Sequence, residues 1–171
     1  MRQEWSNTRF DRAVRHATEA IIRAAAPLQR FFVTTEAEEP YESFGQMALT
    51  ASRGALIRVS KANSASCVWS PEVNVLARMW HDWTHIVLGE DFSLAGELAT
   101  GKAQLRQLAL IRQLPTRGDD VARVIYADVI GQVLAHGATG RFPVNQAAFV
   151  RAYVEDSAAT LAAHGNGDYD A

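Results

Sequence analysis

The chain has 171 residues and a formal net charge of -2, and 48% of its residues are hydrophobic, which suits one domain spanning residues 1–171. A charge balance this close to zero excludes the electrostatic footprint of a nucleic-acid-binding protein and a polybasic membrane anchor. One cysteine excludes an internal disulfide, the polar N-terminus lacks a signal-peptide core, and no apolar run reaches the ~20 residues that span a bilayer, so we expect a cytoplasmic protein.

The first part of the chain predicts two helices followed by a small β element. Apolar residues recur at helical spacing over residues 8–26, and a proline ends that run. Residues 34–40 are acidic and end in proline, which indicates an exposed loop, and residues 41–52 show a second helical stripe. Within residues 55–70, two β-prone segments, 56–60 and 67–70, flank a turn-rich run, so this region predicts a small hairpin or an irregular loop.

The rest of the chain is predicted to be helical. Ser70-Pro71-Glu72 has the features of a helix start, with serine as N-cap, proline in the first turn and an acid behind it, and Gly89 is a natural stop. Ser93 can cap the next helix, which continues toward Pro115. Further helices are expected over 119–136 and 143–163. The predicted fold is therefore mainly α, a single-domain bundle of about six helices with a small β-like hairpin near residues 55–70.

Three ionisable residues, His81, Asp82 and His85, lie on the helix expected between Ser70 and Gly89, which is the most apolar of the predicted helices. His81 and His85 are four residues apart, which places them on one helix face, roughly 5–6 Å apart at Cβ. Asp82 is rotated by about 100° from His81, where it can be a further ligand or can fix a histidine tautomer. If the next helix packs antiparallel after a tight turn, Glu97 returns at the level of the histidines. These four residues predict a metal site.

The types of ligand limit which metal ions can bind, but they do not determine the reaction. Two imidazoles with one or two carboxylates suit a divalent metal, with zinc first and iron or manganese as alternatives. An open coordination position would allow hydrolysis, decarboxylation or oxidation of a small-molecule substrate, and a filled set would be structural. The metal-free alternative is a buried polar network of the same side chains. Whether the chain is an enzyme stays open at this stage.

The pattern His81-Asp82-Trp83-Thr84-His85, followed by Glu97, resembles the motif of the coenzyme Q assembly protein 4 family. The resemblance implies a mostly helical fold and a divalent metal, above all zinc, held by His81, Asp82, His85 and Glu97. It also implies a role in ubiquinone biosynthesis, in removing the C1 carboxyl of the ring precursor. The stretch from Ser70 to Asp82, with Asp91-Phe92-Ser93 and Gly96-Glu97, also looks like uncharacterised bacteriophage-encoded proteins. That likeness implies an accessory or host-interaction protein in the host cytoplasm, with a protein partner and a structural cluster.

Four other residues are candidates for the surroundings of the site. Gln104 lies seven residues after Glu97 and so shares its helix face, where it can support a ligand. Trp80 and Trp83 can wall an apolar pocket for an aromatic substrate, and Tyr126 can line the same cavity. For each of the three aromatic residues the competing interpretation is an ordinary core position.

Three further hypotheses concern other features of the chain. A phosphohydrolase pattern would combine His16, His81-Asp82 and a late acid such as Asp128, and it needs three helices to converge. Cys67 lacks an evident activating neighbour, so a buried hydrophobic role is expected. The apolar helices expected over 119–136 and 143–163 carry more apolar surface than one small core needs, which suggests a homodimer.

Overall fold

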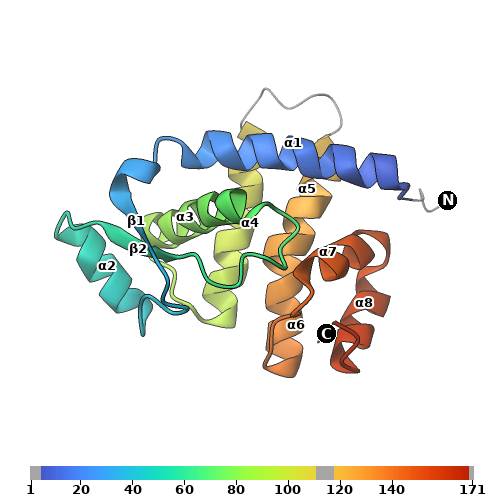
Figure 1. Cartoon of the computed structure of the whole chain (residues 1–171). Coiled ribbons are helices and arrows are strands. Elements are labelled where there is room, and N and C mark those ends of the chain that lie inside the picture. Colours follow the sequence, from blue (N-terminus) through green and yellow to red (C-terminus); the bar gives the residue numbers. More distant parts are fainter. Residues whose placement is uncertain (1–4, 111–117, 170–171) are drawn as a thin grey trace.

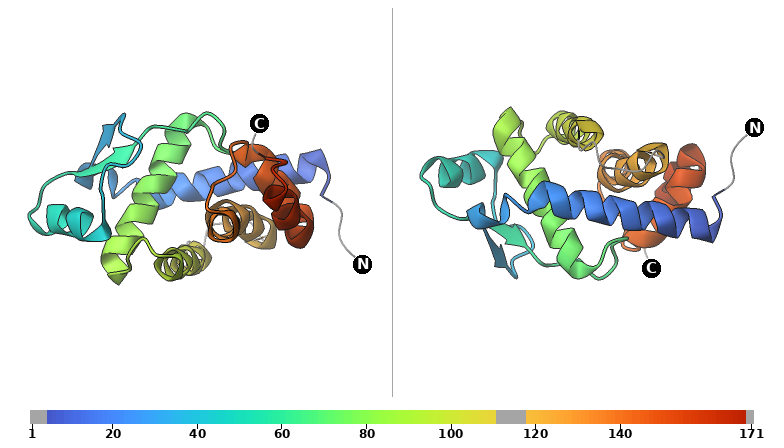
Figure 2. Two further views of the ribbon diagram at one scale, coloured as in Figure 1. Left: turned by 90° about the horizontal axis from the view of Figure 1, so that it is seen from below. Right: turned by 90° about the horizontal axis from the view of Figure 1, so that it is seen from above.

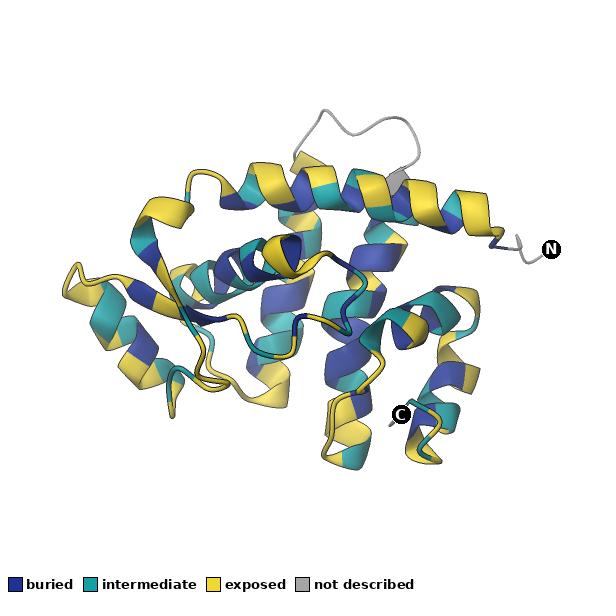
Figure 3. Ribbon diagram, in the orientation of Figure 1, coloured by how far each residue is buried: buried dark blue, intermediate teal, exposed yellow. Residues whose placement is uncertain are grey.

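The computed structural model describes residues 5–110 and 118–169, and its main feature is a long first helix that crosses the others (Figure 1). Helix α1 (Asn7–Ala25) begins at Ser6, whose side chain accepts a hydrogen bond from the backbone N–H of Arg9. Figure 3 shows exposed and buried residues alternating along α1. The buried ones recur at helical spacing and form one face, which packs on the helices below: Phe10, Ala13, Ala17, Ala20 and Ile21.

The β element is a two-stranded parallel sheet. Strand β1 (Phe32–Thr35) follows a 3-10 turn, η1 (Gln29–Phe31), and pairs in parallel with β2 (Ile57–Ser60). Helix α2 (Phe44–Ser52) lies in the connection between them, and a connection of this length is what parallel pairing requires. The predicted strand over 56–60 is therefore present. The hairpin with residues 67–70 does not form. The partner of β2 is β1, whose last two residues, Thr34 and Thr35, belong to the stretch expected to be a loop.

Packing accounts for that choice of partner. The inward side chains of β2, Ile57 and Val59, are each 1% exposed and join a cluster with Phe32 of β1 and Met47 of α2. This cluster also contacts the next helix through Met79. A strand from residues 32–35 closes the apolar cluster, which the sequence around 67–70 does not do. Figure 2 shows this sheet and α2 at one end of the molecule and α7 and α8 at the other.

Helices α3 (Pro71–Leu88) and α4 (Leu94–Leu110) form an antiparallel pair. The start of α3 is as predicted, since Ser70 accepts a hydrogen bond from the N–H of Val73 and Pro71 occupies the first turn. Gly89 ends the helix with a left-handed backbone, φ 73°, which glycine adopts without strain. Side-chain contacts confirm the antiparallel arrangement, because residues later in α3 contact residues earlier in α4: Trp80 with Gln107, His81 with Gln104, His85 with Thr100.

The C-terminal half contains one long helix with an irregular turn and one unexpected break. Helix α5 (Gly118–Tyr126) continues through a π-helical segment, η2 (Ala127–Gly131), into α6 (Gln132–Thr139). The single helix expected over 143–163 is two helices, α7 (Gln146–Glu155) and α8 (Ser157–Gly165). Asp156 separates them, because its backbone is extended and its side chain caps α8 by accepting from the N–H of Ala159.

The fold class predicted from the sequence, mainly helical with a small β element, is confirmed. The larger core lies where α1, α3, α5 and α7 meet, and its fully buried members include Ala17, Val124, Phe149 and Val150. Among the described residues, no helix combines the length and the apolar character needed to cross a membrane. Helix α3 contributes to both cores, through Trp80 to the larger one and through Met79 to the smaller one, and the candidate site lies between α3 and α4.

Candidate metal centre

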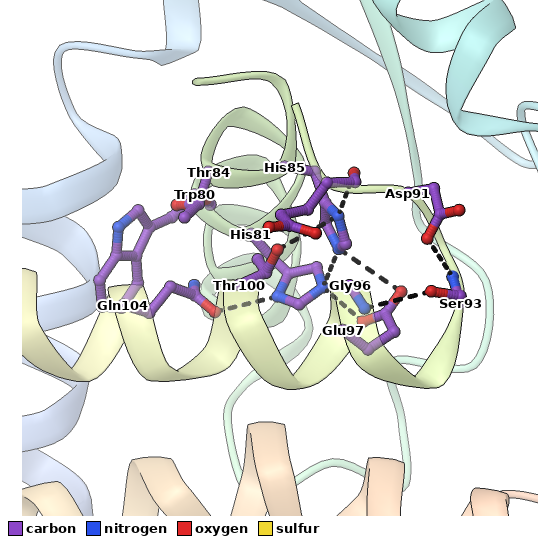
Figure 4. A network of polar contacts seen from close by, with 11 residues as sticks. Trp80, His81, Thr84, His85, Asp91, Ser93, Gly96, Glu97, Thr100 and Gln104 are labelled. Carbon is purple, nitrogen blue, oxygen red and sulfur yellow. Dashed lines mark hydrogen bonds and ion pairs between the residues drawn. The ribbon is translucent and has the colours of Figure 1, made fainter. Parts of the chain in front are cut away.

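Three predicted ligands converge between α3 and α4 (Figure 4). The Nε2 atom of His81 lies 3.0 Å from Oε2 of Glu97, and Nε2 of His85 lies 3.4 Å from Oε1 of the same carboxylate. The two Nε2 atoms are 3.0 Å apart. One ligand atom from each residue lies within 4.8 Å of the others, so the cluster is compact enough to hold a metal ion.

Hydrogen bonds made by the Nδ1 atoms of both histidines determine where the lone pairs of their Nε2 atoms point. Nδ1 of His85 lies 2.9 Å from the backbone carbonyl oxygen of Glu90, which can only accept, so Nδ1–H donates there. Nδ1 of His81 lies 2.9 Å from Oε1 of the fully buried Gln104 and donates to it. Both Nε2 lone pairs therefore point toward Glu97. Metal-binding histidines are usually oriented in this way, with the other ring nitrogen donating to an oxygen.

The charges in the cluster favour a shared cation. Burial alone would lower the pKa of His81, but its contacts with Glu97 outweigh burial and raise that pKa. Burial alone would raise the pKa of Glu97, but hydrogen bonds from His81 and His85 lower it to about 2. Two Nε2 lone pairs at 3.0 Å repel each other unless a proton or a metal ion lies between them. The donor set, two nitrogen lone pairs and an ionised carboxylate, therefore fits a divalent ion.

The turn between α3 and α4 places Glu97 beside the two histidines. Oδ1 of Asp91 accepts from the N–H of Ser93, and the Ser93 hydroxyl accepts from the N–H of Gly96 at the start of α4. The backbone passes so close here that a Cβ on Gly96 would lie 2.0 Å from the carbonyl oxygen of Asp91. Glycine at position 96 is therefore required for a turn this tight, and the turn sets the height of Glu97 beside His85.

We expect Gly96→Ala to destabilise the protein by about 1–3 kcal/mol, because the turn must open to accept the methyl group. Opening the turn moves Glu97, so zinc affinity should fall as well. Thermal unfolding and a zinc titration measure the two effects. Gly45→Ala is the matched control, because a Cβ there would meet nothing nearer than 3.8 Å. Equal stability and zinc affinity in the two variants would contradict this role of the turn.

Asp82 is not brought into the cluster. It lies on the shoulder of α3 and lines a cleft of about 440 Å³ on the side of β2 and residues 38–42, together with Arg58 and Arg78. Burial raises the pKa of Asp82 to about 6, against the lowering influence of His81 and His85. The rotation of about 100° from His81 therefore turns the Asp82 side chain away from the ion position.

The aromatic residues expected around the site, Trp80, Trp83 and Tyr126, make other contacts. The indole N–H of Trp80 donates to Oε1 of Gln107 at 2.6 Å within the main core, and the Trp83 ring stacks on Phe31 at 4.8 Å. Tyr126 is 38% exposed. None of these three aromatic residues lines either cleft next to the histidines. The reason is helical rotation, since positions 80 and 83 point away from the face that carries His81 and His85.

A second cleft, of about 250 Å³, opens on the other side of α3 and is bordered by His81 and Glu97. The side chains of His81 and Glu97 remain 22% and 23% exposed, whereas His85 is fully buried. The cluster is thus open on one side only. The facing wall comes from η2 and α6 and carries Asp128, which sequence reasoning placed only in the phosphohydrolase pattern. The sequence contained one signal for Asp128 as a site residue, which is that it is an acidic residue among the apolar residues Ala127, Val129 and Ile130.

The phosphohydrolase pattern does not assemble. His16 lies on α1, where it faces Glu19 at 3.5 Å, and it lines neither cleft. The thiol of Cys67 is buried and donates to Oε1 of Gln146 at 3.0 Å. Burial raises the pKa of Cys67 to about 11, so it is a poor nucleophile.

Comparisons of the chain with protein-family models, with curated proteins and with solved structures found no match. The motif resemblance of residues 81–97 stays a prediction. The case for a functional site therefore depends on the geometry of His81, His85 and Glu97, and on the cleft that borders two of them.

Proposed function

We propose that this protein binds a divalent metal ion through His81, His85 and Glu97, and that zinc is the ion the donor set suits best, with iron and manganese as competitors. One observation carries the proposal. The Nδ1 atoms of both histidines are held by oxygen acceptors, so both Nε2 lone pairs converge on an ionised carboxylate. The motif resemblance to the coenzyme Q assembly protein 4 family supports the same three residues and adds Asp82.

The same geometry supports an enzyme. Three protein ligands leave a coordination position free on a tetrahedral ion, as in catalytic zinc sites, and the exposed edges of His81 and Glu97 face the 250 Å³ cleft. A bound divalent ion supplies Lewis-acid chemistry to a substrate oxygen. The chain itself orients the two imidazoles and keeps water away from His85. Hydrolysis, decarboxylation and oxidation all fit such a site. The cleft combines polar side chains with the apolar Val129, Val133 and Phe142, so it fits a small substrate that has a polar and an apolar part.

A structural role is the second candidate, and one observation favours it. Glu97 already contacts both imidazoles, at 3.0 and 3.4 Å, so a single proton on His81 satisfies the cluster without a metal. In that case the cluster would stabilise the α3–α4 pair, and the protein would be an accessory or interaction protein of the bacteriophage kind. Metal content separates the two candidates.

We expect tag-free protein to contain close to one equivalent of zinc, iron or manganese by plasma mass spectrometry, and the double variant His81→Ala/His85→Ala to contain none. His16→Ala is the control, since that histidine lies on α1 away from the cluster. Retention of the metal by the double variant would place the site elsewhere. A folded parent that takes up no zinc, iron or manganese on titration would leave the polar network as the function of the cluster.

A further inference from the structure

The 250 Å³ cleft has a second carboxylate on the wall opposite the histidines. Asp128 belongs to η2, the π-helical segment of the long C-terminal helix. Single π-helical turns are rare, and they occur frequently at functional sites. We propose that this cleft is the substrate site of the metal centre, and that Asp128 is the acceptor that binds an O–H or N–H group of a small polar substrate. The inference rests on the proposed metal-binding function.

Two hydrogen bonds hold the Asp128 carboxylate in place, and its oxygens can still accept hydrogen bonds from a ligand. Its Oδ2 accepts from the indole N–H of Trp69 at 2.8 Å, and its Oδ1 accepts from the side-chain amide of Gln132 at 2.9 Å. A carboxylate has about four lone-pair positions, so each oxygen can accept once more. Within the described ranges, no cation forms an ion pair with Asp128. Arg78 and His81 line the same cleft and act on Asp128 without a direct ion pair, so a carboxylate oriented by two neutral donors can still accept a hydrogen bond from a ligand.

The rest of the lining indicates the class of ligand. Asn74 donates through Nδ2 to Ser64, Gln132 donates through Nε2 to Asp128, and Gln146 accepts through Oε1 from Cys67. Oxygen acceptors therefore remain on Asn74 and Gln132, beside those of Asp128. Donors remain as well, on the amide groups of Gln132 and Gln146 and on the guanidinium of Arg78, so the cleft suits a ligand that carries both hydroxyl or N–H groups and oxygen acceptors.

The size of the cleft sets a further limit. Its volume of about 250 Å³ lies below the ~300–1,000 Å³ of pockets that take drug-sized ligands, so the ligand must be small. A bound molecule would have one side toward His81 and Glu97 and the other toward Asp128. The substrate would thus carry an oxygen for the metal centre and, across a small molecular frame, a donor for Asp128.

The probe for this arrangement is acetohydroxamic acid, which offers oxygen ligands for zinc together with an N–H donor. We expect zinc-loaded protein to bind it in calorimetric titrations, and Asp128→Asn to weaken binding at least ~10-fold, the loss expected for a hydrogen bond to a charged acceptor. Acetate, which has no donor, should bind equally well or better in that variant. Asp11→Asn, on the exposed side of α1, is the matched control and should bind both probes like the parent.

A second variant tests the cleft independently of Asp128. Ala77 lines the cleft one turn before His81, so Ala77→Leu should fill it and abolish acetohydroxamate binding while one zinc equivalent remains. Unchanged acetohydroxamate affinity in Asp128→Asn, with zinc bound, would overturn the role of Asp128. A zinc-loaded parent that binds no acetohydroxamic acid would overturn the cleft as a substrate site and leave the metal centre standing. A parent that binds no zinc would overturn the proposed function, and this inference with it.

Discussion

His85→Ala is expected to lower the free energy of unfolding by about 3 kcal/mol and to abolish zinc binding, whereas His81→Ala should abolish zinc binding at a much smaller loss of stability. The His85 side chain is completely buried and donates to the carbonyl oxygen of Glu90. Its removal leaves a cavity and a backbone acceptor without its partner. The His81 side chain is 22% exposed, so water can replace part of what is lost.

Denaturant unfolding in metal-free buffer gives the two stabilities, and zinc titration of the folded variants gives the two affinities. His136→Ala is a suitable control, because its ring stacks on the exposed Phe142 near the end of α6 and lies outside the cluster. It should keep full zinc affinity. Zinc binding that survives His81→Ala would remove that residue from the ligand set. A zinc-free stability that falls equally in both histidine variants would contradict the difference in burial.

The three ligands were predictable because the signals that place them are local. Helical periodicity puts His81 and His85 on one face, and Ser70, Pro71 and Gly89 fix where the helix begins and ends. The short turn to Ser93 leaves an antiparallel return as the simplest path, so the height of Glu97 follows from counting residues. Each step depends on contacts between residues close in sequence.

The surroundings of the site were not predictable, because they depend on contacts between distant segments. The side chain of Asp82 faces a cleft built by β2 and residues 38–42, and the parallel pairing of β1 with β2 is itself a long-range choice. Asp128 owes its place to the Trp69 indole and to a π-helical turn that no periodicity marks. The break at Asp156 had a local signal in the sequence, because an Asp-Ser pair is typical of a helix start. The apolar periodicity that continues on both sides of it favoured a single helix instead.

Zinc at about 100 times its dissociation constant should raise the free energy of unfolding by about 2.7 kcal/mol at pH 8, and this stabilisation should disappear near pH 5. For a chain of this length that corresponds to roughly 5–11 °C in melting temperature. The pH dependence follows from ligand protonation. Zinc needs the unprotonated Nε2 of His81, whose pKa lies above its ordinary value, so protons displace the metal as pH falls through that pKa.

In the zinc-free protein, the contribution of the His81–Glu97 bond to stability should fall as pH rises, whereas stabilisation by zinc should increase. Measuring stability against pH with and without zinc therefore tests the site. A raised pKa for His81 means that its bond to Glu97 stabilises the fold below the unfolded-state pKa, and that this contribution is lost as pH rises through the raised value. The lowered pKa of Glu97 gives a contribution that is present above its unfolded-state value and lost as pH falls toward 2. Above the raised pKa of His81, zinc therefore takes the place of the lost proton between His81 and Glu97. Differential scanning calorimetry with zinc, and with magnesium as a hard-cation control, tests this. A zinc-induced shift of equal size at pH 5 and pH 8, or one that persists in His81→Ala/His85→Ala, would contradict coordination by these imidazoles.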